Sequence, residues 1–206
     1  MKQSDEIGLI ILAAGASVRF GSAKQLANFE GETLLRRIAR ESLASVCRPV
    51  VVVLGAEVNK SKNQVSDLDV QIIKNPDWRE GMGSSIKTGL NKLLKINESI
   101  NGVVLTVCDQ PFVTGEAIDK LVETYRSTPA LIIASAYQET LGVPALFSRQ
   151  LFPRLTELKG SGGAKQIIKQ FQSETMGVSF PAGAVDIDTP EDFEKLHSQE
   201  NQSPTK

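Results

Sequence analysis

Residues 12–26 read LAAGASVRFGSAKQL and follow a short apolar run, IGLII, at residues 7–11. The apolar run predicts a strand that is buried on both faces, as in the middle of a parallel sheet. The small residues after it predict a loop at the carboxyl end of that strand, where open α/β sheets bind ligands. Small residues let a ligand approach the backbone closely, and successive N–H groups can hold an anion.

Two cations, Arg19 and Lys24, lie in the same loop and cannot neutralise each other. Together with the backbone N–H groups they suit a polyphosphate. The loop matches neither common phosphate motif, because Ser22 stands where a P-loop needs lysine and no G-x-G-x-x-G opens a helix. A tight turn without a ligand therefore remains the alternative interpretation of the spacing.

Composition is that of an ordinary globular chain. A length of 206 residues suffices for one α/β domain, and 41% hydrophobic with 23% charged residues is typical of soluble domains. A net charge of -1 argues against a nucleic-acid partner, and no apolar run is long enough to cross a membrane. The first residues lack the pattern of a signal peptide. Cys47 and Cys108 adjoin apolar runs, which predicts buried, reduced thiols in a cytoplasmic protein.

Strand-like and helix-like segments alternate along the first two thirds of the chain. Further strands are predicted at residues 50–54, 70–73, 103–107 and 131–134. Helices are predicted at residues 33–45, 84–95 and 114–126, with a short one within 59–67. This alternation predicts a single α/β domain, Rossmann-like, with a mostly parallel central sheet and helices on both faces.

The last third departs from this rhythm. Residues 143–147 predict a strand that runs against the others, residues 149–158 and 163–171 predict helices, and residues 185–187 predict a last strand. Thr189 then opens a helix, with proline next and Asp192 three positions on, close to a capping box. We expect the domain to span residues 1–197 and residues 198–206 to be a disordered tail.

Acidic residues follow two of the predicted strands. Asp109 comes just after the strand at 103–107, so it is placed at the ligand end of the sheet and can hold Mg²⁺. Asp186 and Asp188 flank Ile187, and their spacing directs both carboxylates to one face of an extended segment. One of them could complete a metal site with Asp109; turn formation and helix capping are the alternative roles.

The order of these motifs resembles the molybdenum-cofactor nucleotidyltransferases, above all their cytidylyltransferase branch. The resemblance rests on the loop at 12–26, NPDWREGMGSS at 75–85, CDQP at 108–111, GVPALF at 142–147, GAK at 163–165 and DIDTPED at 186–192. It implies the nucleotidyltransferase fold, Mg²⁺ dependence, and transfer of CMP from CTP to molybdopterin or another phosphate-bearing acceptor, with release of pyrophosphate. A molybdoenzyme or its chaperone is an implied partner; nucleic acid and membrane are not.

The resemblance also assigns residues. Catalytic roles fall on Arg19, Lys24 and Asp109, and metal binding on Asp109 and Asp188, with Asp188 preferred to Asp186. Residues 81–85 predict a polar helix start, for which a plain serine cap is the alternative. The implied nucleotide-binding set is Leu12, Ala13, Ala14, Gly15, Ser17, Arg19, Lys24, Gly81, Ser84, Ser85 and Asp109.

The alternatives concern specificity and activity. Ala13 and Ala14 before the loop glycine favour the cytidylyl over the guanylyl branch, while Val143 stands where the family has histidine and no acidic residue lies in 160–163. The same chemistry with GTP, or on a sugar or polyol phosphate, is one alternative. A nucleotide-binding sensor without turnover is another. The carboxylates of Asp109 and Asp188 would face and repel each other at the predicted metal site. We therefore expect Asp109→Asn to raise the stability of the metal-free protein while it abolishes turnover.

Overall fold

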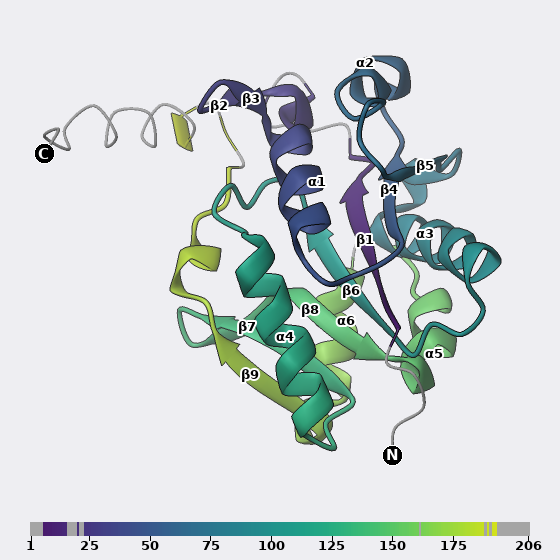
Figure 1. The fold of residues 1–206 in the computed structure, drawn as a ribbon, viewed down its shortest axis with the longest axis vertical. Coiled ribbons are helices and arrows are strands. Elements are labelled where there is room, and N and C mark those ends of the chain that lie inside the picture. Colours follow the sequence, from purple (N-terminus) through teal and green to yellow (C-terminus); the bar gives the residue numbers. More distant parts are fainter. Residues whose placement is uncertain are drawn as a thin grey trace, which may run out of the picture.

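The computed structural model describes residues 6–15, 20, 23–160, 162–187, 189 and 191–192. These residues form a seven-stranded sheet between two layers of helices (Figure 1). The strand order is β5-β4-β1-β6-β8-β7-β9, and every pair is parallel except those that β8 makes with β6 and β7. The strands are β1 Ile7–Ala13, β4 Val50–Leu54, β5 Gln71–Lys74, β6 Gly102–Val107, β7 Ile132–Tyr137, β8 Thr140–Ser148 and β9 Thr175–Ser179.

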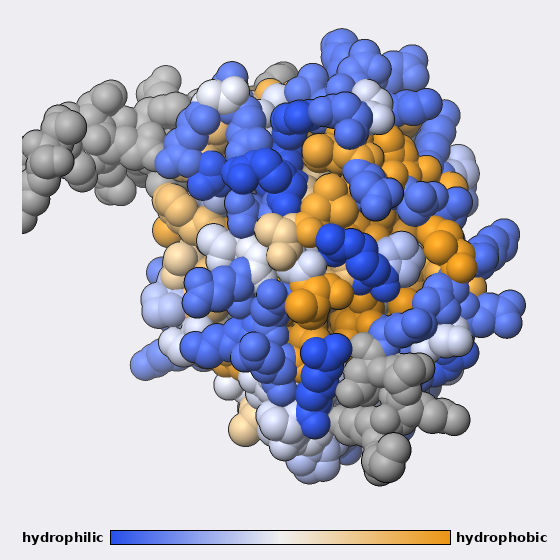
Figure 2. Space-filling view, viewed as in Figure 1, coloured by the Kyte–Doolittle hydropathy of each residue, from blue (hydrophilic) through white to orange (hydrophobic). Residues whose placement is uncertain are grey.

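Helices cover both faces of the sheet, as the alternation predicted. Helices α1 and α4 lie on one face, and α3, α5 and α6 on the other (Figure 1). Figure 2 shows polar side chains over α1 and α4, with apolar side chains reaching the surface beside α1, over the neighbouring strands. The helices are α1 Leu34–Ala44, α2 Val58–Asn63, α3 Met82–Ile96, α4 Gly115–Ser127, α5 Phe152–Thr156 and α6 Gly163–Gln170.

Strand β1 is the centre of the core, and all seven of its residues are buried. Leu9 and Ile11 pack in the cluster that includes α1 and α4, whereas Ile10 and Leu12 pack in the cluster of α3, α5 and α6. Successive side chains of a strand point to opposite faces, so an unbroken apolar run is needed to fill both layers. The prediction of a doubly buried strand is confirmed.

Capping side chains fix where the helices start. The Thr33 and Thr114 hydroxyls accept hydrogen bonds from backbone N–H groups of α1 and α4, at 3.3 and 3.2 Å. The Thr189 N–H donates to Asp192 Oδ2 at 3.0 Å, and the Asp192 N–H donates to Thr189 Oγ1 at 3.2 Å. These two reciprocal bonds confirm the predicted capping box.

The last third of the chain holds the differences from prediction. The antiparallel strand is confirmed as β8, but the parallel edge strand β9 was not predicted, nor was the short hairpin of β2 Asn28–Phe29 and β3 Glu32–Thr33. Residues 185–187 form no strand; they follow a 3-10 turn at Pro181–Ala184. The N–H of Ile187 instead donates to the carbonyl of Asp109 at 2.9 Å. The predicted tail at 198–206 lies outside the described residues.

The strand order creates a switch point between β1 and β6. From β1 the chain moves outward through β4 to β5, and it then returns to β6 on the other side of β1. Ligands of open α/β sheets bind at the carboxyl ends of the strands at such a point. Leu12 pairs with Val107, so the loop after β1 and the turn after β6 leave the sheet side by side. In the part of the chain that the structure describes, no helix is both long and apolar enough to span a membrane.

Candidate active site

A cavity of about 490 Å³ opens beside the carboxyl end of β1. The loop after β1 forms one wall, and the segment that leads into α3 forms the other. The predicted nucleotide-binding residues Leu12, Ala14, Gly15, Gly81 and Ser85 all line it. The fold therefore brings two distant segments of the predicted set into one site. The complete lining is Leu12, Ala14, Gly15, Trp78, Arg79, Gly81, Met82 and Ser85.

Close backbone contacts hold the loop wall in place. The N–H of Ala56 donates to the carbonyl of Ala14 at 3.1 Å. Gly55 has no room for a side chain, because a Cβ there would collide with the same carbonyl and with Trp78. The Arg79 guanidinium lies over the Trp78 ring, 4.6 Å from its centroid, which is a cation–π arrangement. The β1 end, the β4 end and the Trp78 turn thus form one rigid frame.

The site also contains residues that the sequence-based set omitted. Trp78, Arg79 and Met82 line the cavity, yet the prediction took only glycine and serine from the segment 75–85. Aromatic and apolar side chains in a turn follow no period that separates a cavity wall from packed surface. Their position inside the motif at 75–85 was the available signal.

A buried amide organises the start of α3. Asn75 is fully buried, and its Nδ2 donates to Ser84 Oγ at 2.9 Å and to Ser85 Oγ at 3.0 Å. Its Oδ1 accepts from the N–H of Asp77 at 3.0 Å. The Ser84 hydroxyl lies 2.9 Å from the carbonyls of both Asp77 and Gly81. The two serines therefore share one amide, but only Ser85 lines the cavity beside β1.

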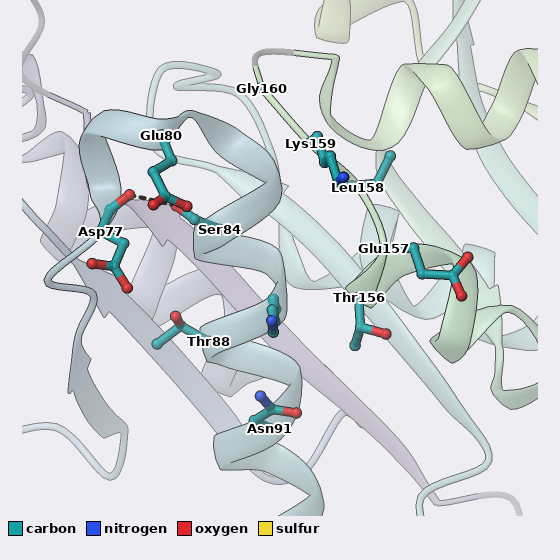
Figure 3. A pocket seen from close by; sticks show the side chains of 11 residues that line it. Asp77, Glu80, Ser84, Thr88, Asn91, Thr156, Glu157, Leu158, Lys159 and Gly160 are labelled. Carbon is teal, nitrogen blue, oxygen red and sulfur yellow. Dashed lines mark hydrogen bonds between the residues drawn. The ribbon is translucent and has the colours of Figure 1, made fainter.

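Ser84 faces a second cavity, of about 760 Å³, on the outer side of α3 (Figure 3). In Figure 3 the side chains of α3 lie opposite the segment 156–160, and the dashed line marks the bond from Ser84 to the Asp77 carbonyl. The lining follows α3 from Ser84 to Asn91, away from the carboxyl edge of the sheet where α3 begins. This second cavity is therefore not placed to share a ligand's reacting end with Asp109.

An ion pair joins the loop to the end of β6. Lys24 Nζ lies 2.5 Å from Asp109 Oδ2, and the two side chains are only 18% and 22% exposed. The other carboxylate oxygen, Asp109 Oδ1, is buried and has no hydrogen-bond partner among the described residues. A buried, unpartnered carboxylate oxygen fits a hard divalent cation. Asp109 therefore suits its predicted metal role, and Lys24 lies next to it.

Residues 185–187, which follow the 3-10 turn, run against the turn that comes after β6 and carries Asp109. Ile187 is buried against Phe29, and its N–H bond to the Asp109 carbonyl anchors the segment there. Burial raises the pKa of Tyr137, and the carboxylates of Asp186 and Asp109 raise it further. Since Asp186 directly precedes Ile187, the backbone bond from Ile187 brings the Asp186 residue close to Asp109.

Part of the predicted set cannot be placed. Ser17, Arg19 and Asp188 lie outside the described residues, so their roles stay predictions. Within the described ranges, no three acidic, histidine or cysteine side chains gather closely enough to hold a metal ion. Cys47 and Cys108 are buried and free of disulfides, as predicted.

This sheet, with its small-residue loop and acidic turn at the switch point, defines a nucleotide-handling α/β domain. Residues 9–175 match the family described as the MobA-like NTP transferase domain. Because the match covers most of the chain, the chain belongs to this family of nucleotidyltransferases.

Proteins similar to this chain carry different names. Nicotine blue oxidoreductase of Paenarthrobacter nicotinovorans is 28% identical over 198 residues, covering 91% of this chain and 94% of that protein. Molybdenum cofactor cytidylyltransferase of Escherichia coli (strain K12) is 24% identical over 188 residues, covering 91% and 93%. The crystal structure of Rv0371c in complex with manganese, from Mycobacterium tuberculosis H37Rv, has a TM-score of 0.74 at 22% identity and covers 93% of this chain and 97% of that one. The last likeness shows a shared fold.

Proposed function

We propose that this protein transfers CMP from CTP to the phosphate of a molybdopterin-type acceptor and releases pyrophosphate. The observation that carries the proposal is the arrangement at the switch point. The cavity between the β1 loop and α3 lies at the same edge of the sheet as the Lys24–Asp109 pair. A base and ribose fit the cavity, and a triphosphate fits the Lys24–Asp109 pair.

In the proposed reaction, an oxygen of the acceptor phosphate attacks the α-phosphorus of the nucleotide. A new P–O bond forms, the bond from the α-phosphorus to the bridging oxygen breaks, and pyrophosphate leaves with the electron pair. The attacking phosphate is already ionised, so no general base is needed. The chain contributes positioning and charge neutralisation, which supply most of the rate in phosphoryl transfer.

Lys24 has the central position in this scheme. Its ammonium group has three donors, so it can keep Asp109 and contact a phosphate oxygen at the same time. Backbone N–H groups of the β1 loop, together with Arg19, would hold the remaining phosphate oxygens. A divalent cation, when bound, would neutralise charge on the triphosphate, and Asp109 Oδ1 would hold it. We propose Mg²⁺, with Asp188 preferred to Asp186 as the second ligand; the manganese complex of Rv0371c supports a divalent site on this fold.

The choice of CTP and of acceptor rests on the cytidylyltransferase relative and on Ala13 and Ala14 before the loop glycine. GTP, or a sugar or polyol phosphate acceptor, is the nearer alternative. The name of the oxidoreductase relative indicates a different class of enzyme. An oxidoreductase would need an electron carrier in the cavity. The free, buried cysteines support a cytoplasmic site of action.

Pyrophosphate release tests the proposal. The purified protein is mixed with Mg²⁺, one nucleoside triphosphate at a time, and either molybdopterin loaded with molybdate or a sugar phosphate. We expect release with CTP and the molybdopterin acceptor, its loss in Lys24→Ala, and no change in Lys60→Ala, a lysine that is 72% exposed in α2. No release from any nucleotide with any acceptor would contradict a transferase and leave a nucleotide sensor.

A further inference from the structure

We infer that Asn75 is a positioning residue for the nucleotide: it donates to the Ser85 hydroxyl oxygen and so directs the hydroxyl proton toward the bound base. The inference rests on the proposed function and adds how the cavity reads the base. Asn75 does not line the cavity, so it acts through Ser85.

Counting hydrogen bonds fixes the orientation of the Asn75 amide. The backbone N–H of Asp77 can only donate, so the atom that faces it at 3.0 Å must be the carbonyl oxygen Oδ1. Nδ2 then faces the two serines, and its two hydrogens go to Ser84 Oγ and Ser85 Oγ. Because Asn75 is fully buried, water cannot take over any of these bonds.

Counting hydrogen bonds also distinguishes the hydroxyl proton of Ser84 from that of Ser85. The Ser84 proton has acceptors, the carbonyls of Asp77 and Gly81 at 2.9 Å. Ser85 Oγ accepts from Asn75, and its own proton has no acceptor among the described residues. Ser85 is 4% exposed, and a buried donor without an acceptor destabilises the protein. Since Ser85 lines the cavity, a bound ligand is what supplies the acceptor.

The shape of the cavity identifies the part of the ligand that meets Ser85. Leu12, Trp78 and Met82 give the walls apolar and aromatic surfaces, which suit a planar base, while the phosphates belong with the Lys24–Asp109 pair. The group on Ser85 is then an acceptor atom of the base, and we assign it to a base carbonyl oxygen. For a pyrimidine nucleotide it is the carbonyl at C2, the one that cytosine carries.

Binding of CTP to four variants, measured by titration calorimetry, tests the inference. Asn75→Asp keeps the size of the side chain but presents an acceptor to the serines, so the Ser85 proton turns away from the cavity. We expect Asn75→Asp and Ser85→Ala each to weaken CTP binding about tenfold, about 1.4 kcal/mol. The double variant should be no weaker than either single one, because both changes remove the same bond. Ser99→Ala, a control at an exposed serine just beyond the far end of α3, should stay within about twofold.

A substrate analogue covers the case in which Asn75→Asp does not fold. The sulfur of 2-thiocytidine triphosphate is a weak acceptor, so we expect it to bind the unaltered protein less tightly than CTP does. Ser85→Ala should bind the two nucleotides equally, and in turnover its KM for CTP should rise while kcat stays unchanged.

The outcomes distinguish this inference from the proposed function. If the unaltered protein binds and turns over CTP but Ser85→Ala and Ser99→Ala behave alike, the inference is wrong and the function stands. Additive losses in the double variant would also overturn it. If the unaltered protein binds no nucleoside triphosphate, the proposed function fails first and the inference with it.

Discussion

Removal of the Asp109 charge, with its shape retained, is the sharpest test of the site. Asp109→Asn keeps the size of the side chain but leaves Lys24 Nζ facing a neutral amide instead of a carboxylate at 2.5 Å. Sequence reasoning predicted a gain in stability, because it considered only repulsion from a second carboxylate. The structure reverses the expected sign, since the nearest charge to Asp109 among the described residues is the Lys24 ammonium.

The size of the effect follows from burial. Exposed ion pairs contribute up to about 1 kcal/mol, and hydrogen bonds to charged groups about 1.5–3 kcal/mol. With 18% and 22% exposure, this pair lies between the two cases, and the long stem of Lys24 lets its ammonium reach water once the partner is lost. We therefore expect Asp109→Asn to lower the free energy of unfolding by about 1–2 kcal/mol, which shifts Tm down by about 2–8 °C.

Urea denaturation of four proteins measures this effect: unaltered, Asp109→Asn, Lys24→Met and the double variant. We expect a coupling energy of about 1 kcal/mol between the two positions, and pyrophosphate release at least about a hundredfold slower in Asp109→Asn. An Asp109→Asn protein as stable as the unaltered one, or a cycle with no coupling, would refute the reasoning about Lys24. Unchanged turnover would refute the catalytic assignment of Asp109.

Three further outcomes are expected. Gly83→Ala should lower the free energy of unfolding by about 1–3 kcal/mol in thermal denaturation, because its Cβ would lie 2.5 Å from the carbonyl of Leu158; a stable variant would show that this contact yields. Burial raises the pKa of the Cys47 and Cys108 thiols to about 12, so a disulfide reagent at pH 8 should label neither until the protein unfolds, and rapid native labelling would contradict their burial. CTP with Mg²⁺ should raise Tm more than GTP does, since binding at a hundredfold excess over Kd adds about 2.7 kcal/mol; a larger shift with GTP would point to the guanylyl branch.

Strong local signals made most of the fold predictable. The unbroken apolar run at 7–11 predicted a strand buried on both faces, which the structure confirms. The structure likewise confirms the helix starts predicted at Thr33, Thr114 and Thr189. Strand β9 could not be found this way, because most of its residues are exposed or half-buried at the sheet edge and carry no apolar period. The predicted strand at 185–187 failed because its one buried side chain, Ile187, packs on Phe29 instead of joining the sheet.

The site was predictable where its residues follow strands directly. The loop after β1 converges with Gly81, which precedes α3, and with Ser85 in the first turn of α3, because parallel strands end at one edge. Ser84 and Ser85 are indistinguishable in a motif, yet one helix position turns a side chain by about 100°, enough to place them on different cavities. The Lys24–Asp109 pair spans 85 positions and depends on the tertiary path of the loop, which no local pattern describes.

Two adjacent residues at the switch point, Asp109 and Gln110, direct their side chains to different partners. The Asp109 side chain faces Lys24, whereas Gln110, 3% exposed, donates from Nε2 to the carbonyl of Gly183 at 3.0 Å and lies 3.5 Å from the Tyr137 hydroxyl. Tyr137 in turn donates to the carbonyl of Val143, and a Cβ at position 142 would collide with its hydroxyl.

We propose that the nucleotide half of the site lies on β1 and α3, and that a second half, for the acceptor, lies on β7, β8 and the turn at Pro181–Ala184. Val143, the position where this chain departs from the family's histidine, belongs to the second half. Val143 does not line the cavity beside β1 and is not part of the Lys24–Asp109 pair. This separation gives a physical reason why one fold carries relatives named for a cytidylyltransferase and for an oxidoreductase. In this proposal, buried strands hold the nucleotide-binding frame, while the surroundings of the second reactant lie in turns and an antiparallel strand that can change independently.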